Sequence, residues 1–224
     1  MGSRLIEDGP SGASDMVLAV ELQLPGSVPS RSPTWLALLV ERATAGDAAA
    51  FEQIMIHSQQ RVMAMSWRIL GNEADARDAS QEVFLRVYKY LGRFKQDQDF
   101  FAWVYRITVN VCRDMLKKRQ HQNDRFGSLA TDSVEQILEI PSEDKDAEQS
   151  LIQTQRRELI SRAIATLPFK ERASIVLRDV EGLSTDEVAR VLKSSSTTVR
   201  SQISSARRKI RDYCRRYLKV GQES

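Results

Sequence analysis

The sequence has few of the residues that build disulfide frameworks, metal sites and nucleophilic active sites. Its 224 residues include two cysteines, Cys112 and Cys214, and two histidines, His57 and His121. The cysteines form no CxxC pair, which favours reduced thiols over a disulfide or a zinc site. No GxSxG or GxxxxGK stretch occurs, and neither histidine has a second ligand at metal-binding spacing. The sequence therefore predicts no enzyme activity, no metal and no cofactor.

Long apolar runs and strand signals are also missing. No run approaches the ~20 apolar residues of a membrane-spanning helix. The short apolar stretch MVLAVELQL contains Glu21 and makes a poor signal peptide. No Asn-Gly or Asp-Gly turn separates two alternating runs, so β-hairpins are not expected. We therefore expect a cytoplasmic protein with no membrane span and no sheet.

Helical signals dominate from Thr34 onward. Gly, Pro and Ser are frequent in residues 1–33, which we expect to be a disordered tail. Residues 121–150 lose their apolar periodicity and predict a linker. The predicted helices cover roughly residues 34–45, 47–70, 73–91, 99–120, 149–166, 168–180, 184–192 and 196–218. The predicted fold is all-α, with helical domains over 34–120 and 151–218 joined by a flexible linker.

Charge is distributed unevenly, although the net charge is only +3. Residues 197–219 hold eight Lys or Arg against one acid, and residues 100–120 hold five against one. The linker holds eight acids against two basic residues. Two basic helical segments separated by an acidic stretch indicate two surfaces for a polyanion and a linker that avoids it.

The C-terminal basic segment completes a predicted helix-turn-helix. At about 100° per residue, Val199, Ile203, Ala206 and Ile210 share one buried face. The opposite face and its flanks carry small hydroxyls and basic residues that suit base edges and phosphates. A short helix precedes it, opened by a capping box of Ser184 and Glu187. The unit favours DNA binding, and a solvated basic helix is the alternative; the turn lacks the glycine common there.

Two N-terminal helices have distinct outer faces. In DARDASQEVFLRVYKYLGRF, the acidic face with an exposed Leu85 fits either solvated surface or a docking site. In FFAWVYRITVNVCRDMLKKRQ, Trp103 and a row of polar and basic residues lie opposite the buried stripe. Such a face suits unpaired nucleic acid, because bases stack on rings while cations follow the backbone. Trp103 also fits plain core packing.

These segments, in this order, resemble the bacterial extracytoplasmic-function (ECF) sigma factors. The resemblance rests on LVERATAGDAAAFEQI, LGNEADARDASQEVFLRVYKYLGRF, FFAWVYRITVNVCRDMLKKR and LPFKERASIVLRDVEGLSTDEVARVL followed by TTVRSQISSARRKIR, and it spans about residues 35–217. It implies an alternative sigma factor for stress responses. Such a protein binds core RNA polymerase and recognises promoter DNA, single-stranded at the −10 element and double-stranded at the −35 element.

The resemblance also implies roles for individual residues. The polymerase-binding set is Asp75, Asp78, Gln81, Glu82 and Leu85. The −10 set is Trp103, Arg106, Asn110, Arg113 and Lys117. The −35 set is Thr197, Thr198, Arg200, Ser201, Gln202, Ser205, Arg207, Arg208 and Lys209. Within it, Arg200 and Ser201 are expected to read bases, and Arg207, Arg208 and Lys209 to bind phosphates. The family often has arginines where Gln202 and Ser205 stand.

The resemblance further implies an anti-sigma partner, nucleoid association within the holoenzyme, and membrane tethering through the inhibitor. Promoter elements two to three duplex turns apart are separated by ~70–100 Å. The 30 residues of the linker can extend to about 100 Å. Two other readings fit parts of the sequence: a helix-turn-helix regulator acting without polymerase, and a helical adaptor for acidic proteins. Neither needs the acidic helix followed by the Trp103 helix.

Overall fold

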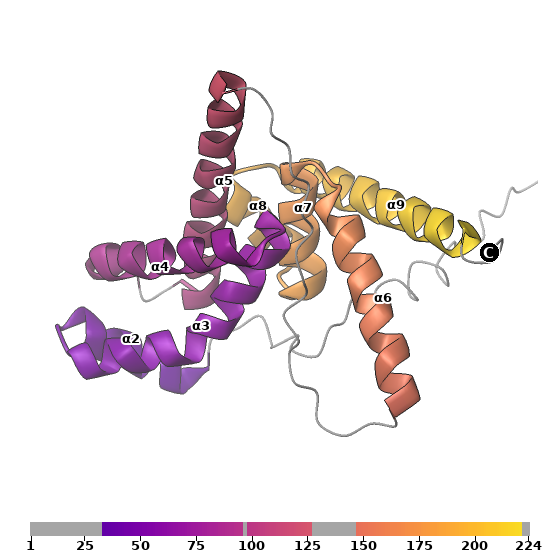
Figure 1. The fold of residues 1–224 in the computed structure, drawn as a ribbon. Helices are drawn as coiled ribbons and strands as arrows, with labels where there is room; N and C mark the ends of the chain where they lie inside the picture. The colour runs from indigo at the N-terminus through magenta and orange to yellow at the C-terminus, as the bar shows by residue number, and fades with distance from the viewer. Residues whose placement is uncertain (1–32, 96–97, 127–146, 221–224) are drawn as a thin grey trace, which may run out of the picture.

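The computed structural model describes residues 33–95, 98–126 and 147–220, and every regular element in these ranges is a helix (Figure 1). The N-terminal half contains α2 (Thr34–Thr44), α3 (Ala48–Leu70), α4 (Glu73–Tyr90), the 3₁₀ turn η1 (Leu91–Arg93) and α5 (Phe100–Phe126). The C-terminal half contains α6 (Ala147–Ala165), α7 (Phe169–Ile175), the π-helical segment η2 (Val176–Val180), α8 (Thr185–Leu192) and α9 (Ser196–Val220). The all-α prediction is confirmed.

Side-chain caps fix where several helices begin. The carboxylate of Asp47 and the amide oxygen of Asn72 each accept a hydrogen bond from the backbone N–H three residues further on. Ser184 and Glu187 form the predicted capping box at the start of α8. Such caps satisfy N–H groups that the first helical turn leaves unpaired, and each contributes about 1 kcal/mol.

Helix α3 lies at the centre of the N-terminal half, where it contacts α2, α4 and α5. Its buried side chains include Ile54, Val62 and Met65, and α4 adds Val83 and Val87. These positions recur at helical spacing, so each helix turns one apolar stripe inward and leaves its polar side to water.

The C-terminal half forms around α9, which contacts α6, α7 and α8. The predicted stripe of Val199, Ile203, Ala206 and Ile210 is buried. The eight-residue α8, a tight turn and the first part of the 25-residue α9 form the predicted helix-turn-helix.

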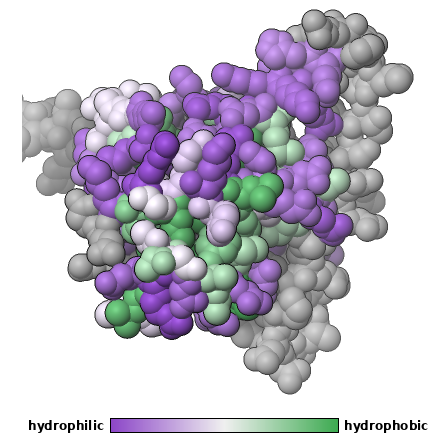
Figure 2. Space-filling model, turned by 90° about the vertical axis from the view of Figure 1, so that its left-hand side faces the viewer, coloured by the Kyte–Doolittle hydropathy of each residue, from purple (hydrophilic) through white to green (hydrophobic). Residues whose placement is uncertain are grey.

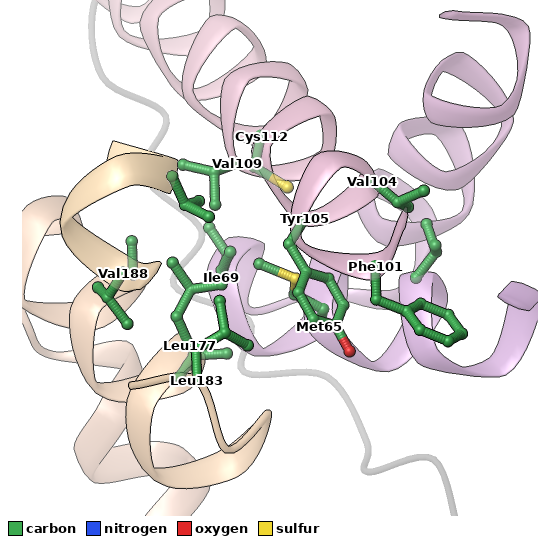
Figure 3. Close-up of a cluster of buried hydrophobic side chains, with 14 of the residues drawn as sticks. Met65, Ile69, Phe101, Val104, Tyr105, Val109, Cys112, Leu177, Leu183 and Val188 are labelled. Atoms are coloured by element: carbon green, nitrogen blue, oxygen red, sulfur yellow. The ribbon is translucent and has the colours of Figure 1, made fainter. Parts of the chain in front are cut away.

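The two halves pack against each other, which the sequence did not predict. Helix α5 contacts α8, and α3 contacts α6, α7 and η2. Figure 3 shows Ile69 and Val109 from the N-terminal half in one cluster with Leu177, Leu183 and Val188 from the other. The described halves therefore share a continuous apolar core.

The predicted tail and most of the predicted linker lie outside the described residues. Residues 1–32 and 127–146 are not among the described ranges. Helix α5 continues to Phe126, beyond the expected end at 120, and α6 begins at Ala147, before the expected start at 149.

Lys193 forms the turn between α8 and α9 in a left-handed conformation. Its φ is 51° and its ψ is 51°. Glycine usually fills this position after a helix, because a side chain there crowds the backbone. This explains how the turn forms without glycine: a lysine accepts the conformation at an energetic cost.

We expect Lys193→Gly to raise the free energy of unfolding by about 0.5–1 kcal/mol. Glycine relieves the left-handed strain, and its greater freedom in the unfolded chain offsets part of that gain. Urea denaturation measures the change. Lys193→Val is the opposing control and should lower stability, since a β-branched residue fits this backbone poorly; a valine variant as stable as the parent would refute the strain.

Candidate polymerase and nucleic-acid interfaces

The outer face of α4 combines acidic, polar and apolar side chains. Asp78, Gln81 and Leu85 are exposed, and Leu85 keeps 66% of its surface open to solvent. Tyr88, three residues beyond Leu85, is 68% exposed, and its ring meets Phe51 edge-on. Figure 2 shows hydrophobic patches among hydrophilic residues on the side of the molecule that lies at the left of Figure 1. Sequence reasoning missed Tyr88, although its spacing from Gln81 and Leu85 places it on the same face.

The other two predicted α4 residues have partners within the chain. The Asp75 carboxylate accepts a hydrogen bond from the Asn72 amide at 2.7 Å and lies 3.4 Å from Arg119 on α5. Glu82 accepts one from Arg86 at 2.6 Å. The predicted set therefore divides into open residues and residues that also stabilise the N-terminal half.

Helix α5 exposes three of the five residues predicted for the −10 element. Arg106, Arg113 and Lys117 are exposed. Asn110 is half-buried, and its amide oxygen accepts a hydrogen bond from Arg113 at 2.8 Å. The four residues form one polar row, opposite the buried stripe that includes Tyr105.

Trp103 lies at the start of this row but packs inward. Its ring centroid is 5.2 Å from that of Phe94 and 5.8 Å from that of Phe100, and its side chain is partly buried. This aromatic cluster anchors the first turn of α5. Its remaining surface adjoins the basic row, so packing and base stacking are compatible roles.

The first turns of α9 form an open polar face. Thr197, Thr198, Arg200 and Ser201 are exposed, and Arg208 is exposed two turns further on. The hydroxyl of Ser195 accepts a hydrogen bond from the Thr198 backbone N–H at 3.1 Å and so caps the helix. Ser204, which the predicted set omitted, is also exposed. The short side chains allow close approach, and the arginines lie at either end of the face.

The other predicted α9 residues have hydrogen-bond partners inside the C-terminal half. Arg207 makes two hydrogen bonds to Asp179 at 2.8 and 2.9 Å. The side chain of Asp179 is only 7% exposed. Gln202 accepts a hydrogen bond from the buried Ser174 at 2.7 Å. These residues attach α9 to the segment before the helix-turn-helix.

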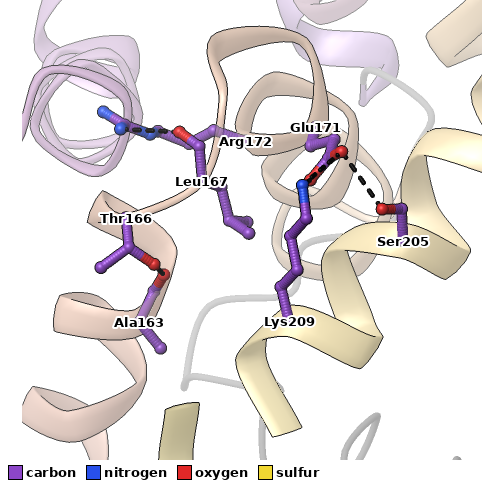
Figure 4. Close-up of polar contacts among 7 residues, drawn as sticks. All are labelled: Ala163, Thr166, Leu167, Glu171, Arg172, Ser205 and Lys209. Atoms are coloured by element: carbon purple, nitrogen blue, oxygen red, sulfur yellow. Dashed lines mark hydrogen bonds and ion pairs between the residues drawn. The ribbon is translucent and has the colours of Figure 1, made fainter. Parts of the chain in front are cut away.

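Glu171 provides a second attachment point for α9. Its carboxylate accepts hydrogen bonds from Lys209 at 2.8 and 2.9 Å and from Ser205 at 3.2 Å (Figure 4). Sequence reasoning did not identify the roles of Glu171 and Asp179, because each lies 28 or more residues before its partners in the chain. Their partners become apparent only in the folded chain.

Two other site types have no candidates in the described ranges. Among those residues, no group of three His, Cys, Asp or Glu side chains could hold a metal ion. In the same part of the chain, no helix combines the length and apolarity that crossing a bilayer requires. What the described surface does offer is one mixed acidic and apolar face and two basic helical faces.

Known families match both halves of the chain. The family described as Sigma-70 region 2 matches residues 55–122, and the family described as Sigma-70, region 4 matches residues 157–210. The ECF RNA polymerase sigma factor SigE of Mycolicibacterium smegmatis is 31% identical over 186 residues, covering 83% of this chain and 69% of that protein. The RNA polymerase sigma-H factor of Pseudomonas aeruginosa is 31% identical over 175 residues, covering 77% and 90%.

Solved structures resemble the fold. CnrH, in complex with the cytosolic domain of CnrY, is 26% identical with a TM-score of 0.54, covering 79% of this chain and 94% of that one. The sigma factor RpoE of Bartonella quintana, in complex with the anti-sigma factor NepR, shares the fold at 17% identity and a TM-score of 0.61, covering 74% and 96%.

The fold and its faces define a two-part DNA-binding protein of the sigma-70 class. Within that class, the chain belongs to the ECF sigma factor family. It is an alternative sigma factor that binds core RNA polymerase and directs transcription initiation. A helix-turn-helix regulator acting alone, or an adaptor for acidic proteins, would not account for matches to both regions.

We expect Asp179→Ala to lower the free energy of unfolding by about 1–3 kcal/mol, because it leaves the partly buried Arg207 guanidinium without its bidentate partner. Chemical denaturation measures the loss. Glu158→Ala is the matched control: it removes a half-exposed carboxylate 3.7 Å from Arg162 on the same helix. That change should cost no more than about 0.5 kcal/mol. Equal losses would show that Asp179 has no special part in holding α9.

Proposed function

We propose that this sigma factor uses three separate faces: α4 for core polymerase, α5 for the melted −10 strand and α9 for the −35 duplex. The observation that carries the proposal is the pairing of a mixed acidic and apolar face on α4 with basic faces on α5 and α9. We assign the N-terminal domain to residues 34–120 and the C-terminal domain to 151–218. The chain acts by binding alone, without catalysis.

The α4 face suits a protein partner. Leu85 and Tyr88 supply exposed apolar surface, and Asp78 and Gln81 lie beside them on the same side of the helix. Apolar anchors within a charged rim are typical of protein interfaces. Asp75 and Glu82 belong to this face as well, and each would keep or exchange its internal partner when polymerase binds.

The α5 face suits single-stranded DNA. Arg106, Arg113 and Lys117 place three cations along one side of the helix, with Asn110 between them as a hydrogen-bonding group. Cations spaced along a helix follow a phosphate backbone, and an aromatic edge such as that of Trp103 offers a surface for a base.

The α9 face suits the major groove. Arg200 and Ser201 occupy the first turns of the second helix, the part that reaches base edges in a helix-turn-helix. Thr197, Thr198 and Arg208 adjoin them and suit phosphates. The remaining predicted residues keep their proposed DNA roles only if they exchange the internal partners that hold α9 in place: Gln202, Ser205, Arg207 and Lys209.

We also propose an anti-sigma partner and a cytoplasmic location. RpoE was solved with the anti-sigma factor NepR, and CnrH with the cytosolic domain of CnrY. An inhibitor of this kind would cover the α4 face or the basic faces. Nucleoid association would follow from holoenzyme formation, and membrane tethering from an inhibitor that itself spans the membrane.

Transcription with purified core polymerase tests the function directly. Promoter DNA is first selected from a random pool by the reconstituted holoenzyme. We expect specific transcripts only when the chain is added. Specific transcripts that appear only when the chain is present would support the proposed function. A chain that does not bind core polymerase would contradict it.

Charge reversal on α4 tests the polymerase face. We expect Asp78→Lys combined with Glu82→Lys to weaken binding to core polymerase at least tenfold, while duplex binding by α9 is retained. Fluorescence anisotropy with labelled chain measures both. Glu52→Lys, an exposed change on α3, is the control and should leave polymerase affinity unaltered. Unchanged affinity in the double variant would remove α4 from the interface.

Arg200→Ala tests base reading by α9. We expect it to weaken binding to the selected −35 duplex by about 1–3 kcal/mol, with a smaller loss on random duplex. Arg208→Ala should weaken binding to both duplexes by the same factor and reduce the salt dependence of the affinity, as loss of a phosphate contact does. Equal losses on the two duplexes for Arg200→Ala would refute its role as a base reader.

A further inference from the structure

A buried polar junction connects the two halves of the chain. The Tyr105 hydroxyl on α5 donates a hydrogen bond to the Glu181 carboxylate at 2.7 Å. Arg68 on α3 lies 3.7 Å from the other carboxylate oxygen. Tyr105 is 1% exposed and Glu181 6% exposed. Burial raises the pKa of Tyr105, which therefore stays a hydrogen-bond donor.

Arg172 on α7 makes a second connection across the same boundary. Its guanidinium donates to the carbonyl oxygen of Ile69 at 2.6 Å, near the end of α3. It also donates to Leu167 at 2.9 Å and to Ala165, at the end of α6. One side chain therefore caps helices from both halves, whose last carbonyls lack partners within their own helices.

The backbone around Glu181 positions it for this contact. Its N–H donates to the carbonyl of Val176 five residues earlier at 3.0 Å, which defines the π-helical segment. Gly182 follows with φ 77°, a conformation that favours glycine and turns the chain sharply. Short π segments occur often at functional positions, where they redirect a side chain.

The closed arrangement is too short to span a promoter. Helix α8 contacts α5 and has eight residues, or about 12 Å. The reading face of α9, from Thr197 to Arg208, extends about 18 Å. Laid end to end with the turn between them, these place every −35 residue within roughly 40 Å of α5. Promoter elements two to three duplex turns apart lie about 70–100 Å apart.

We propose that Tyr105, Arg68 and Glu181 form an interdomain latch that keeps the free chain closed, and that holoenzyme formation requires this latch to open. The inference rests on the proposed division of promoter reading between α5 and α9. Once the halves separate, water solvates the Glu181 carboxylate and the Arg68 guanidinium. The latch consequently selects one arrangement of the two halves while contributing little to the cost of separating them. That cost comes chiefly from the apolar contacts of Ile69 and Val109 with the C-terminal half.

The latch predicts that removing one of its members favours the open chain. A ligand that binds only the open form has an apparent Kd equal to its intrinsic Kd divided by the fraction of chain that is open. Glu181→Ala leaves the Tyr105 hydroxyl and Arg68 without their acceptor in the closed state only. We expect apparent affinity for core polymerase to rise by about 3- to 10-fold, corresponding to a parent chain that is open for a tenth to a third of the time.

The experiment compares full-length parent, Glu181→Ala, Tyr105→Phe and Glu158→Ala. X-ray scattering of each free chain should show a larger radius of gyration for Glu181→Ala and Tyr105→Phe only. Binding to core polymerase is then titrated. Tyr105→Phe removes one oxygen atom and keeps the ring, so it remains informative if the alanine variant folds poorly; circular dichroism checks helicity. Glu158→Ala removes an acid of the same domain that pairs with Arg162 on its own helix and takes no part in the latch.

Each outcome decides the matter. Variants that have a larger radius of gyration and also bind core polymerase more tightly than the parent support the latch. Equal radii of gyration for all four chains would overturn the latch. A larger radius of gyration with unaltered affinity for core polymerase would overturn it as well. If none of the chains binds core polymerase, the proposed function fails, while the scattering curves still decide whether the junction holds the halves together.

Discussion

The division of α5 into a buried side and a solvent-exposed side is the constraint on which the rest of the structure depends. Tyr105, Val109 and Cys112 on one side are buried, while Arg106 and Arg113 on the other remain in water. Cations could not enter the apolar side without partners, so this division fixes which side can meet a negatively charged strand. Burial raises the pKa of the Cys112 thiol to about 12, which keeps it uncharged within the core. The same buried side also receives α8, so one helix organises both halves.

Much of the fold follows from local sequence. Helical spacing of apolar residues predicted the observed helices, and Ser184 with Glu187 predicted the start of α8. The buried stripe of α9 was likewise predictable from period alone. These features depend on residues within three or four positions of each other, which is the range over which helix geometry relates sequence to contact.

Contacts between distant segments were not predictable in the same way. Arg207 and Lys209 are typical of a DNA-binding face, yet they bond to carboxylates 28 and 38 residues away in the chain. Long basic side chains reach in several directions, so periodicity does not determine their partners. The boundary between the halves combines apolar residues that any helix would bury with a tyrosine, an arginine and a glutamate whose pairing exists only in the folded chain. The residue types gave no sign of which partners they would meet.

The π-helical segment before Glu181 has a consequence for how sequences of this kind diverge. A π turn accommodates one more residue than the α-helical turn it replaces, and each residue rotates the following chain by about 100°. A relative that lost a single residue within 176–180 would keep a regular helix but turn a different side chain toward the N-terminal half. A change in length at this one place can therefore alter which side chains form the contact between the halves, while α9 stays intact.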